Sequence, residues 1–440
     1  MKLRRLAWAS CAAVGLLLNA ASCGRGPAEP VQPGPVVITV ATFPDLDRSA
    51  KAALAQWQKE RPDVTVKIAS LQYADHHTAM TTVLATGSGV PDVMALDFRF
   101  LGKFAESGGL TDLSQPPFSG MTLQDRFVPF AFAQAINKQG QLIALPTDIG
   151  PGTLLYRQDL LTKAGVAEGD LTRSWESYLA AGRQIKAATG AYLMADAADL
   201  RDILIRSGVQ PGEGLYFDSD GRVLVDTPRF QRAFELGREA RRAGLDANAV
   251  SWSNEWTAGF RQGHIATQMM GGWLVGHLKN WLAPDSTGLW RSAGLPGGQM
   301  ASYGGSFYAI PRLAREKQAA WDFIRFMTTR KDVQIESLRV MDAFPALLAA
   351  QDDPLMGQPI DYLGGQPARL LWRDIARQVP PVPVNKDDAL ATSVIRDEFE
   401  QVLSEGKPIP QALADARTLL ERRTRRLNVV AASPVKAAAP

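Results

Sequence analysis

Three aspartates carry the groups best placed for ligand chemistry: two follow predicted strands, and the third lies in a predicted crossing segment. Asp45 comes after a β-branched run over 36–41, and Asp97 follows a short apolar run over 92–96. Asp148 stands in the stretch LPTDIGPG, whose glycines and prolines predict a crossing between domains. Ligands of open α/β proteins collect beyond the carboxyl ends of strands, and carboxylates accept hydrogen bonds from hydroxyl groups. These positions predict a ligand-binding site.

The same aspartates also allow a purely structural interpretation. Asp97 is placed to cap the helix that follows it or to form an ion pair, and Arg99 lies two residues further on in the same loop. Asp148 is placed to stabilise a turn. Both interpretations stay open at this point.

Aromatic residues supply the second kind of group that such a site needs. Trp273 follows Gly271 and Gly272, which let the backbone approach a ligand closely. Its ring is placed either to stack on a flat apolar face of that ligand or to pack in the core. The other candidates for contact are Phe43, at the end of the first strand, and Trp252 and Trp256, although aromatic residues in a helical region more often pack in the core. Gly304 and Gly305 are placed either to offer backbone N–H groups to the ligand or to form a tight turn.

We find no pattern that predicts catalysis. The chain has only four histidines, and the adjacent pair His76-His77 would point about 100° apart on a helix, a poor arrangement for chelating a metal. No HExxH motif, nucleophile elbow or phosphate loop is present. We therefore expect no catalytic residue, metal or cofactor, although a glycosidase-type pair of carboxylates is not excluded by sequence.

The elements that position these residues alternate in type. Strands are predicted over 36–41, 64–68 and 92–96, with helices over 48–60 and 73–84 between them. This order predicts an α/β fold with a parallel sheet covered by helices. Further along we expect a hairpin of 127–135 with 141–144, and the following strands and helices: strands 154–156, 265–270 and 307–310, and helices 157–164, 174–188, 228–243, 316–329, 389–403 and 409–427.

The first residues predict export. Lys2, Arg4 and Arg5 precede an apolar run over 6–18 and small residues at 20–22, which is typical of a signal peptide over 1–22. Cys23 follows directly and resembles the acylated cysteine of bacterial lipoproteins, with Ala20 where that pattern prefers Leu; an ordinary signal site is the alternative. Residues 23–35 predict a Pro/Gly-rich linker behind a lipid anchor, and 431–440 a disordered tail.

Without residues 1–22 the chain holds 45 basic and 45 acidic residues. A neutral chain argues against binding to nucleic acid. We expect a monomer.

Several segments together resemble family 1 extracellular solute-binding proteins, the sugar-capturing subunits of bacterial ABC importers, which include maltose-binding proteins. The matching segments are GVPDVMALDFRFLGKFAESGGLTDL (89–113), 57–66, LPTDIGPGTLLYRQDLLTKAG (145–165), Ser174-Trp175-Glu176, 260–266, Gly272-Trp273, 304–311, 319–327 and 406–427. Arg157 replaces the usual Asn. Arg99 falls where maltose-binding proteins have an aspartate, so the resemblance does not imply maltose.

The resemblance implies two α/β lobes, each a mostly parallel sheet flanked by helices, joined by crossing segments and closing on ligand like a hinge. The first lobe would hold 36–146 and 305–330, and the second 147–304 and 331–430. The implied function is capture of a neutral mono- or oligosaccharide and its delivery to ABC transporter permease subunits. The alternatives are a secreted carbohydrate-active enzyme and a receptor for another solute, such as a polyamine, a peptide or a metal.

Overall fold

The computed structural model describes residues 35–210 and 212–432, with side chains through residue 424. Cys23, the predicted signal peptide and most of the predicted linker and tail lie outside the described residues. Eight strands are present in the part described: β1 (Val36–Thr42), β2 (Val64–Ser70), β3 (Val93–Asp97), β4 (Leu145–Arg157), β5 (Thr267–Gly271), β6 (Trp290–Ala293), β7 (Ser302–Ala309) and β8 (Phe344–Pro345).

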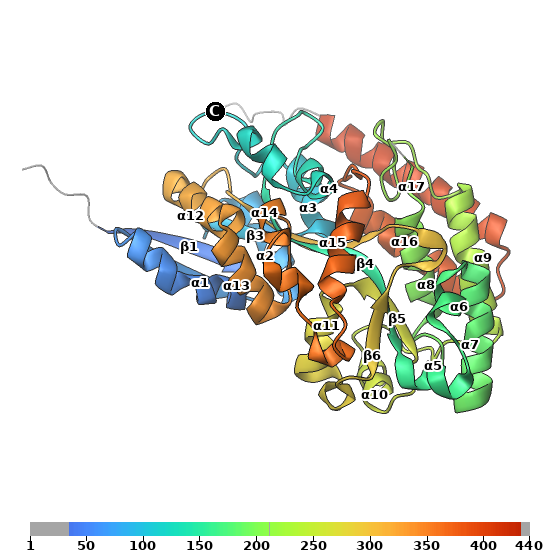
Figure 1. The fold of residues 1–440 in the computed structure, drawn as a ribbon. Coiled ribbons are helices and arrows are strands. Elements are labelled where there is room, and N and C mark those ends of the chain that lie inside the picture. The colour runs from blue at the N-terminus through green and yellow to red at the C-terminus, as the bar shows by residue number, and fades with distance from the viewer. Residues whose placement is uncertain (1–34, 211, 433–440) are drawn as a thin grey trace, which may run out of the picture. The chain divides into compact units, whose positions relative to one another are not determined.

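The helices cover the strands on several sides (Figure 1). They are α1 (Leu46–Glu60), α2 (Tyr73–Thr86), α3 (Phe98–Glu106), α4 (Pro129–Gln134), α5 (Gln158–Ala164), α6 (Glu168–Thr172), α7 (Trp175–Thr189), α8 (Ala197–Ser207), α9 (Pro228–Arg242), α10 (Asn254–Arg261), α11 (Leu274–His277), α12 (Lys317–Thr329), α13 (Lys331–Met341), α14 (Leu348–Gln351), α15 (Ala368–Gln378), α16 (Asp388–Ser404) and α17 (Ile409–Ala432). Short 3-10 turns and one π-helical turn, Leu278–Leu282, complete the set.

The first three strands form the predicted parallel sheet. β1 pairs in parallel with β2, from Val36 opposite Val64 onward, and with β3 through Val40 opposite Val93. β1 is rich in β-branched residues, which suit a pleated strand, and its later residues are buried. The parallel arrangement brings the carboxyl ends of β1, β2 and β3 to one edge, which is where Asp45, Tyr73 and Asp97 stand.

β4 is the strand that connects the two parts of the sheet. Its first half pairs with β7 and β8, and its second half with β5 and β6, always antiparallel. The 13 residues run through Gly150, Pro151 and Gly152, where the sequence predicted a crossing between domains followed by a short strand over 154–156. The named strands around the second half of β4 are thus antiparallel, unlike the mostly parallel sheet expected there. The parallel pairings in this region are single bridges, Tyr192 with Ile265 and Met194 with Asp246.

The predicted hairpin over 127–144 is wrong in its first arm. Pro129 begins the six-residue helix α4, and only Ile136 and Leu142 pair across the turn. Proline has no backbone N–H to donate to a strand but suits the first turn of a helix, and this decides the local structure.

Two buried cores hold the fold together. One gathers residues from β1, β3, α3, α4 and α12, and extends to residues of 249–290 and 344–379; the other lies within 154–301 and 391–420. Trp57 and Trp321 are buried in the first core.

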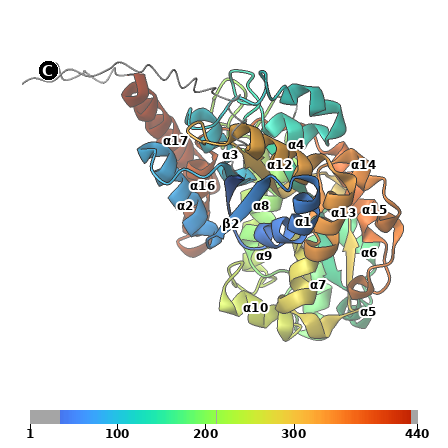
Figure 2. The same ribbon diagram turned by 90° about the vertical axis from the view of Figure 1, so that its left-hand side faces the viewer.

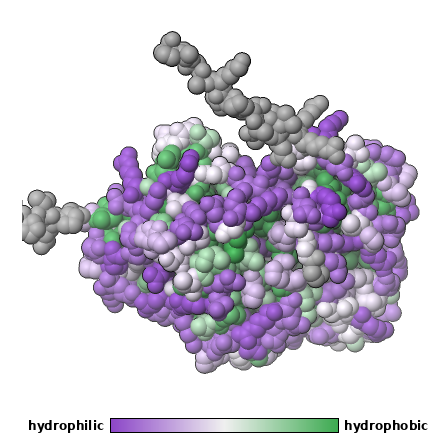
Figure 3. Space-filling view, turned by 90° about the horizontal axis from the view of Figure 1, so that it is seen from above, coloured by the Kyte–Doolittle hydropathy of each residue, from purple (hydrophilic) through white to green (hydrophobic). Residues whose placement is uncertain are grey.

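Helix α13 lies beside α1 and α12 in both views (Figures 1 and 2). Ser49 of α1 is hydrogen-bonded to Ser337 of α13, and Gln56 donates to Asp332 over 2.6 Å. The residues from 331 onward therefore begin with a helix that packs on the first three-strand unit. The face seen in Figure 3 is mostly hydrophilic, with smaller hydrophobic areas between the polar ones.

Candidate functional site

Asp97, Arg99 and Tyr73 form a connected polar group at the edge where β1, β2 and β3 end. Asp97 caps α3 by accepting a 2.9 Å hydrogen bond from the backbone N–H of Arg99, and its carboxylate also accepts from Arg99 Nε over 3.3 Å. Arg99 Nη2 donates to the Tyr73 hydroxyl over 2.7 Å, and the guanidinium lies 5.1 Å from the Tyr73 ring centroid. Both structural roles considered for Asp97, cap and ion pair, are therefore present, and they fix a carboxylate beside a guanidinium.

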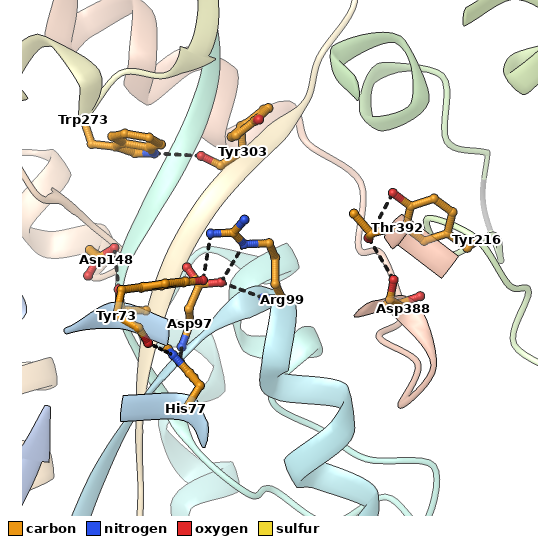
Figure 4. Close-up of polar contacts among 11 residues, drawn as sticks. Tyr73, His77, Asp97, Arg99, Asp148, Tyr216, Trp273, Tyr303, Asp388 and Thr392 are labelled. Atoms are coloured by element: carbon orange, nitrogen blue, oxygen red, sulfur yellow. Dashed lines mark hydrogen bonds and ion pairs between the residues drawn. The ribbon is translucent and has the colours of Figure 1, made fainter. Parts of the chain in front are cut away.

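His77 supports this group from below (Figure 4). Its Nε2 accepts a 3.1 Å hydrogen bond from the backbone N–H of Asp97, and its Nδ1 is 2.8 Å from the Tyr73 carbonyl oxygen. Nδ1 must therefore carry the proton and donate it. Burial lowers the pKa of His77 to about 4, so the ring is neutral at physiological pH. His77 acts as a fixed support that sets the position of Asp97.

Phe43 and Asp45, at the end of β1, have different surroundings. Phe43 is buried and packs against Tyr73 and His77, so its ring supports the polar group rather than facing a ligand. Asp45 is partly exposed, lies 3.6 Å from Arg48 and places its carboxylate 3.8 Å from Nε2 of His277. Asp45 thus connects the end of β1 with α11.

Asp148 lies in the crossing strand, paired in register with Ser306 of β7 and Pro345 of β8. Its carboxylate accepts a 3.3 Å hydrogen bond from the Ser306 hydroxyl. Burial raises the pKa of Asp148 to about 7, and the negative charge of Asp97 adds to the effect. Asp148 can therefore act as donor or acceptor toward a hydroxyl group near neutral pH.

The indole of Trp273 is fixed by a hydrogen bond to one backbone carbonyl group, and three glycines leave room for its Nε1 edge. Its Nε1 donates a 2.7 Å hydrogen bond to the Tyr303 carbonyl oxygen. A Cβ atom on Gly150, Gly271 or Gly304 would stand 2.9, 2.2 or 2.7 Å from that nitrogen. Gly304 and Gly305 have φ values of 109° and 134°, which side chains rarely adopt. Gly150, Gly271 and Gly304 therefore make room for the Trp273 indole, whereas a Cβ on Gly272 would stand 2.7 Å from the Trp372 ring.

Trp252 and Trp256 have opposite environments. Trp256 is completely buried, with its ring centroid 5.0 Å from that of Trp252, so it offers no surface to a ligand in this conformation. Trp252 is 51% exposed and has a φ of 75°, a conformation that costs a non-glycine residue about 1–3 kcal/mol. Its ring is nearly parallel to that of Trp273, with 6.1 Å between centroids.

The structure brings most of these side chains to one place. In Figure 4, Trp273 and Tyr303 lie on one side, Tyr73, Asp97 and Arg99 on the other, and Asp148 at the end of the group. Sequence reasoning missed Tyr73 and Tyr303. Tyr73 follows the predicted strand over 64–68, and Tyr303 directly precedes the candidate Gly304. The position of each tyrosine beside these features could have indicated it.

Arg99 also borders a small cavity, of about 20 Å³, between α3 and the start of α16. Its lining includes Arg206, Tyr216, Asp388 and Thr392. Nε and Nη1 of Arg206 and Oδ1 of Asp388 are buried with no hydrogen-bond partner among the residues that the structure describes. A volume of this size accommodates a group no larger than a water molecule.

No three His, Cys, Asp or Glu side chains among the described residues are grouped so that they could hold a metal ion. Within the same part of the chain, no helix has the length and apolarity that crossing a membrane requires.

Comparisons with known proteins show which family has this sequence pattern and architecture. A model of the family described as bacterial extracellular solute-binding proteins matches residues 41–334. The lactose-binding protein of Rhizobium radiobacter is 29% identical, over 76% of this chain and 79% of its own length. The arabinooligosaccharide-binding protein of Bacillus subtilis is 22% identical, over 89% of this chain and 93% of its own.

Solved structures agree with this result. A family 1 extracellular solute-binding protein superposes with a TM-score of 0.76 at 26% identity, over 88% of this chain and 99% of the other. An ABC transporter associated binding protein of B. animalis subsp. lactis, in complex with β-1,6-galactobiose, gives a TM-score of 0.73 at 23% identity, over 89% and 98%.

This chain belongs to the family of bacterial extracellular solute-binding proteins. The predicted two-lobed α/β fold of that family is confirmed.

Proposed function

We propose that this protein captures a neutral sugar or oligosaccharide between its two lobes and delivers it to the permease of an ABC transporter. The observation that carries the proposal is that one group of side chains holds both an aromatic ring and carboxylates. The ring is Trp273, fixed through Nε1 to Tyr303, and the carboxylates are those of Asp97 and Asp148. A ring stacks on the apolar face of a sugar, while carboxylates and Arg99 bind its hydroxyl groups. The relatives named for lactose and arabinooligosaccharides, and the galactobiose complex, support a sugar as the ligand.

The proposed ligand contacts are Trp273, Asp97, Arg99, Asp148 and Asp45, with Tyr73 added from the structure. Trp252 is a further candidate. Gly304 acts through the room it gives to Trp273, and Gly305 through its close approach to the Asp148 carbonyl oxygen, from which a Cβ would stand 3.1 Å. The lobes are proposed to comprise 36–146 with 305–330, and 147–304 with 331–430, except that α13 at the start of the last segment packs on α1 of the first lobe. Ligand that contacts both lobes would favour the closed state.

Export and anchoring complete the proposal. Membership of an extracellular family supports secretion, and we propose that Cys23 is acylated and tethers the protein to the membrane.

The test is to mix the purified protein with a sugar panel that includes lactose, arabinotriose, maltotriose and β-1,6-galactobiose, and to measure melting temperature and reaction products. A ligand that binds only the native state raises the melting temperature, and the rise grows with the logarithm of the ligand concentration once this exceeds Kd. A shift with one of these sugars and no product supports a receptor. Release of hydrolysed product would instead identify an enzyme, and a shift given only by polyamines or peptides would change the ligand class.

A further inference from the structure

Three tryptophans stand around His277, and we call Trp273, Trp252 and Trp281 the tryptophan row. The centroid of Trp252 is 6.1 Å from that of Trp273 and 6.5 Å from that of Trp281, with interplanar angles of 13° and 31°. The His277 ring meets all three at steep angles, between 76° and 90°. The rings therefore form a continuous series that begins at the candidate site.

The outer two rings face solvent. Trp252 is 51% exposed and Trp281 is 42% exposed. They are also the only tryptophans among the large exposed hydrophobic residues of the described chain. A single exposed apolar side chain needs no explanation, but aligned rings that continue a binding site indicate an interaction surface.

The exposed position of Trp252 is built into the loop that carries it. Ser251 donates to Asp199 over 2.9 Å, and Ser253 caps α10 by accepting from the backbone N–H of Trp256. The buried Trp256 ring packs behind Trp252. Residues on both sides are thus fixed, and Trp252 between them keeps its positive φ of 75°. Backbone strain held in this way is typical of functional positions.

Trp281 is held just as firmly. Its Nε1 donates a 3.0 Å hydrogen bond to His277 Nδ1. Arg261 of α10 donates to the carbonyl oxygens of Trp281 and Leu282 over 2.9 and 3.1 Å. The indole of Trp281 is therefore already ordered before a ligand binds. Less conformational entropy is then lost when the ligand makes contact with it.

Polar groups lie beside the row. The partly exposed Asp45 carboxylate lies 3.8 Å from His277 Nε2, and Arg48 accompanies it at 3.6 Å. Apolar ring faces flanked by an acceptor and a donor suit a sugar, whose C–H faces and hydroxyl edges need both. A purely apolar partner would leave the charged pair buried without hydrogen bonds.

We propose that the tryptophan row is an extended subsite, and that the ligand is an oligosaccharide whose chain runs from Trp273 outward over Trp252 and Trp281. This inference rests on the proposed function and specifies its ligand: a linked chain of sugar rings rather than a monosaccharide. Trp281, which no sequence pattern singled out, determines the preference for longer chains.

The test is isothermal titration of the unaltered protein, Trp281→Ala and Trp281→Phe with three series: galactose, lactose and galactosyl-lactose; arabinose to arabinotetraose; and glucose to maltotetraose. We expect the unaltered protein to bind longer members more tightly within the series that it recognises. Trp281→Ala should lose about three- to tenfold in affinity for the longest members and bind the shortest bound member unchanged. Trp281→Phe keeps a ring and should recover most of the loss.

Leu313→Ala is the matched control, because Leu313 is 58% exposed and lies outside the row; its affinities should not change. Melting temperatures of all variants report whether each is folded. The inference is overturned if Trp281→Ala weakens every chain length equally, or weakens none. The same holds if uptake into cells falls while affinity in solution is unchanged, which would assign the rings to the transporter. Failure of the unaltered protein to bind any sugar would overturn the proposed function and this inference with it.

Discussion

The indole nitrogen of Trp273 donates a 2.7 Å hydrogen bond to the backbone carbonyl of Tyr303, thirty residues along the chain. This bond joins the turn after β5 to the start of β7, the strand that continues into the three-strand sheet. The ring is thereby fixed relative to Asp148 and Asp97, and a ligand that stacks on it meets acceptors in a defined position.

Replacing Trp273 should remove most of the binding. Trp273→Ala is expected to weaken sugar affinity by about 1–3 kcal/mol, as loss of an aromatic anchor does, and Trp273→Phe by less. Titration with whichever panel sugar raises the melting temperature measures the change. An affinity unchanged by the alanine substitution would take Trp273 out of the site.

Gly271 should tolerate no side chain. A Cβ there would lie 2.2 Å from Nε1 of Trp273, so Gly271→Ala must displace the indole, and we expect weaker sugar binding and a loss of about 1–3 kcal/mol in stability. Gly294→Ala is the matched control, since a Cβ at Gly294 meets nothing within 4 Å. Equal melting temperatures and affinities for the two variants would contradict the account of the glycines.

Asp148→Asn should make the protein more stable and bind sugar less well. The pKa of Asp148 is raised to about 7 by burial, so the folded state holds a proton that the unfolded chain gives up near pH 4. The free energy of unfolding therefore falls as pH rises from about 4 to about 7, and above that pH the ionisation of Asp148 changes it no further. The gain in melting temperature from the asparagine should accordingly be absent at pH 4 and full at pH 8.

The affinity of Asp148→Asn should fall because an ionised acceptor is replaced by a neutral amide. Thermal melts across this pH range, with titrations at pH 7.5, measure both effects. A variant that is less stable at pH 8 would show that the charge of Asp148 supports the fold.

The anchor is tested by Cys23→Ser. If Cys23 is acylated, the unaltered protein should sediment with membranes and the variant should be found in the soluble fraction after export. Mass spectrometry of the purified protein checks the lipid directly. An unmodified Cys23 in membrane-free protein would restore the alternative of an ordinary signal site.

The amino-acid sequence by itself determined the order of the elements around the first sheet. Strands β1 to β3 and helices α1 and α2 were predicted because periodicity and turn residues are local properties. It also singled out Trp273, on the expectation that the two preceding glycines let the backbone approach a ligand; in the structure a Cβ on Gly271 would meet the Trp273 indole itself. α4 was not predicted, because the apolar run over 127–135 is also typical of a strand and only Pro129, in the first turn, indicates a helix.

Tertiary structure alone decided which of two neighbouring tryptophans faces solvent. Trp252 and Trp256 are four residues apart, yet one is half exposed and the other fully buried. Their exposure depends on segments distant in sequence: Gln268 of β5 accepts the Trp256 indole hydrogen bond over 3.4 Å, and His277 and Trp281 stand against Trp252. Burial is a property of the packed chain, so residue type and spacing could not assign these roles.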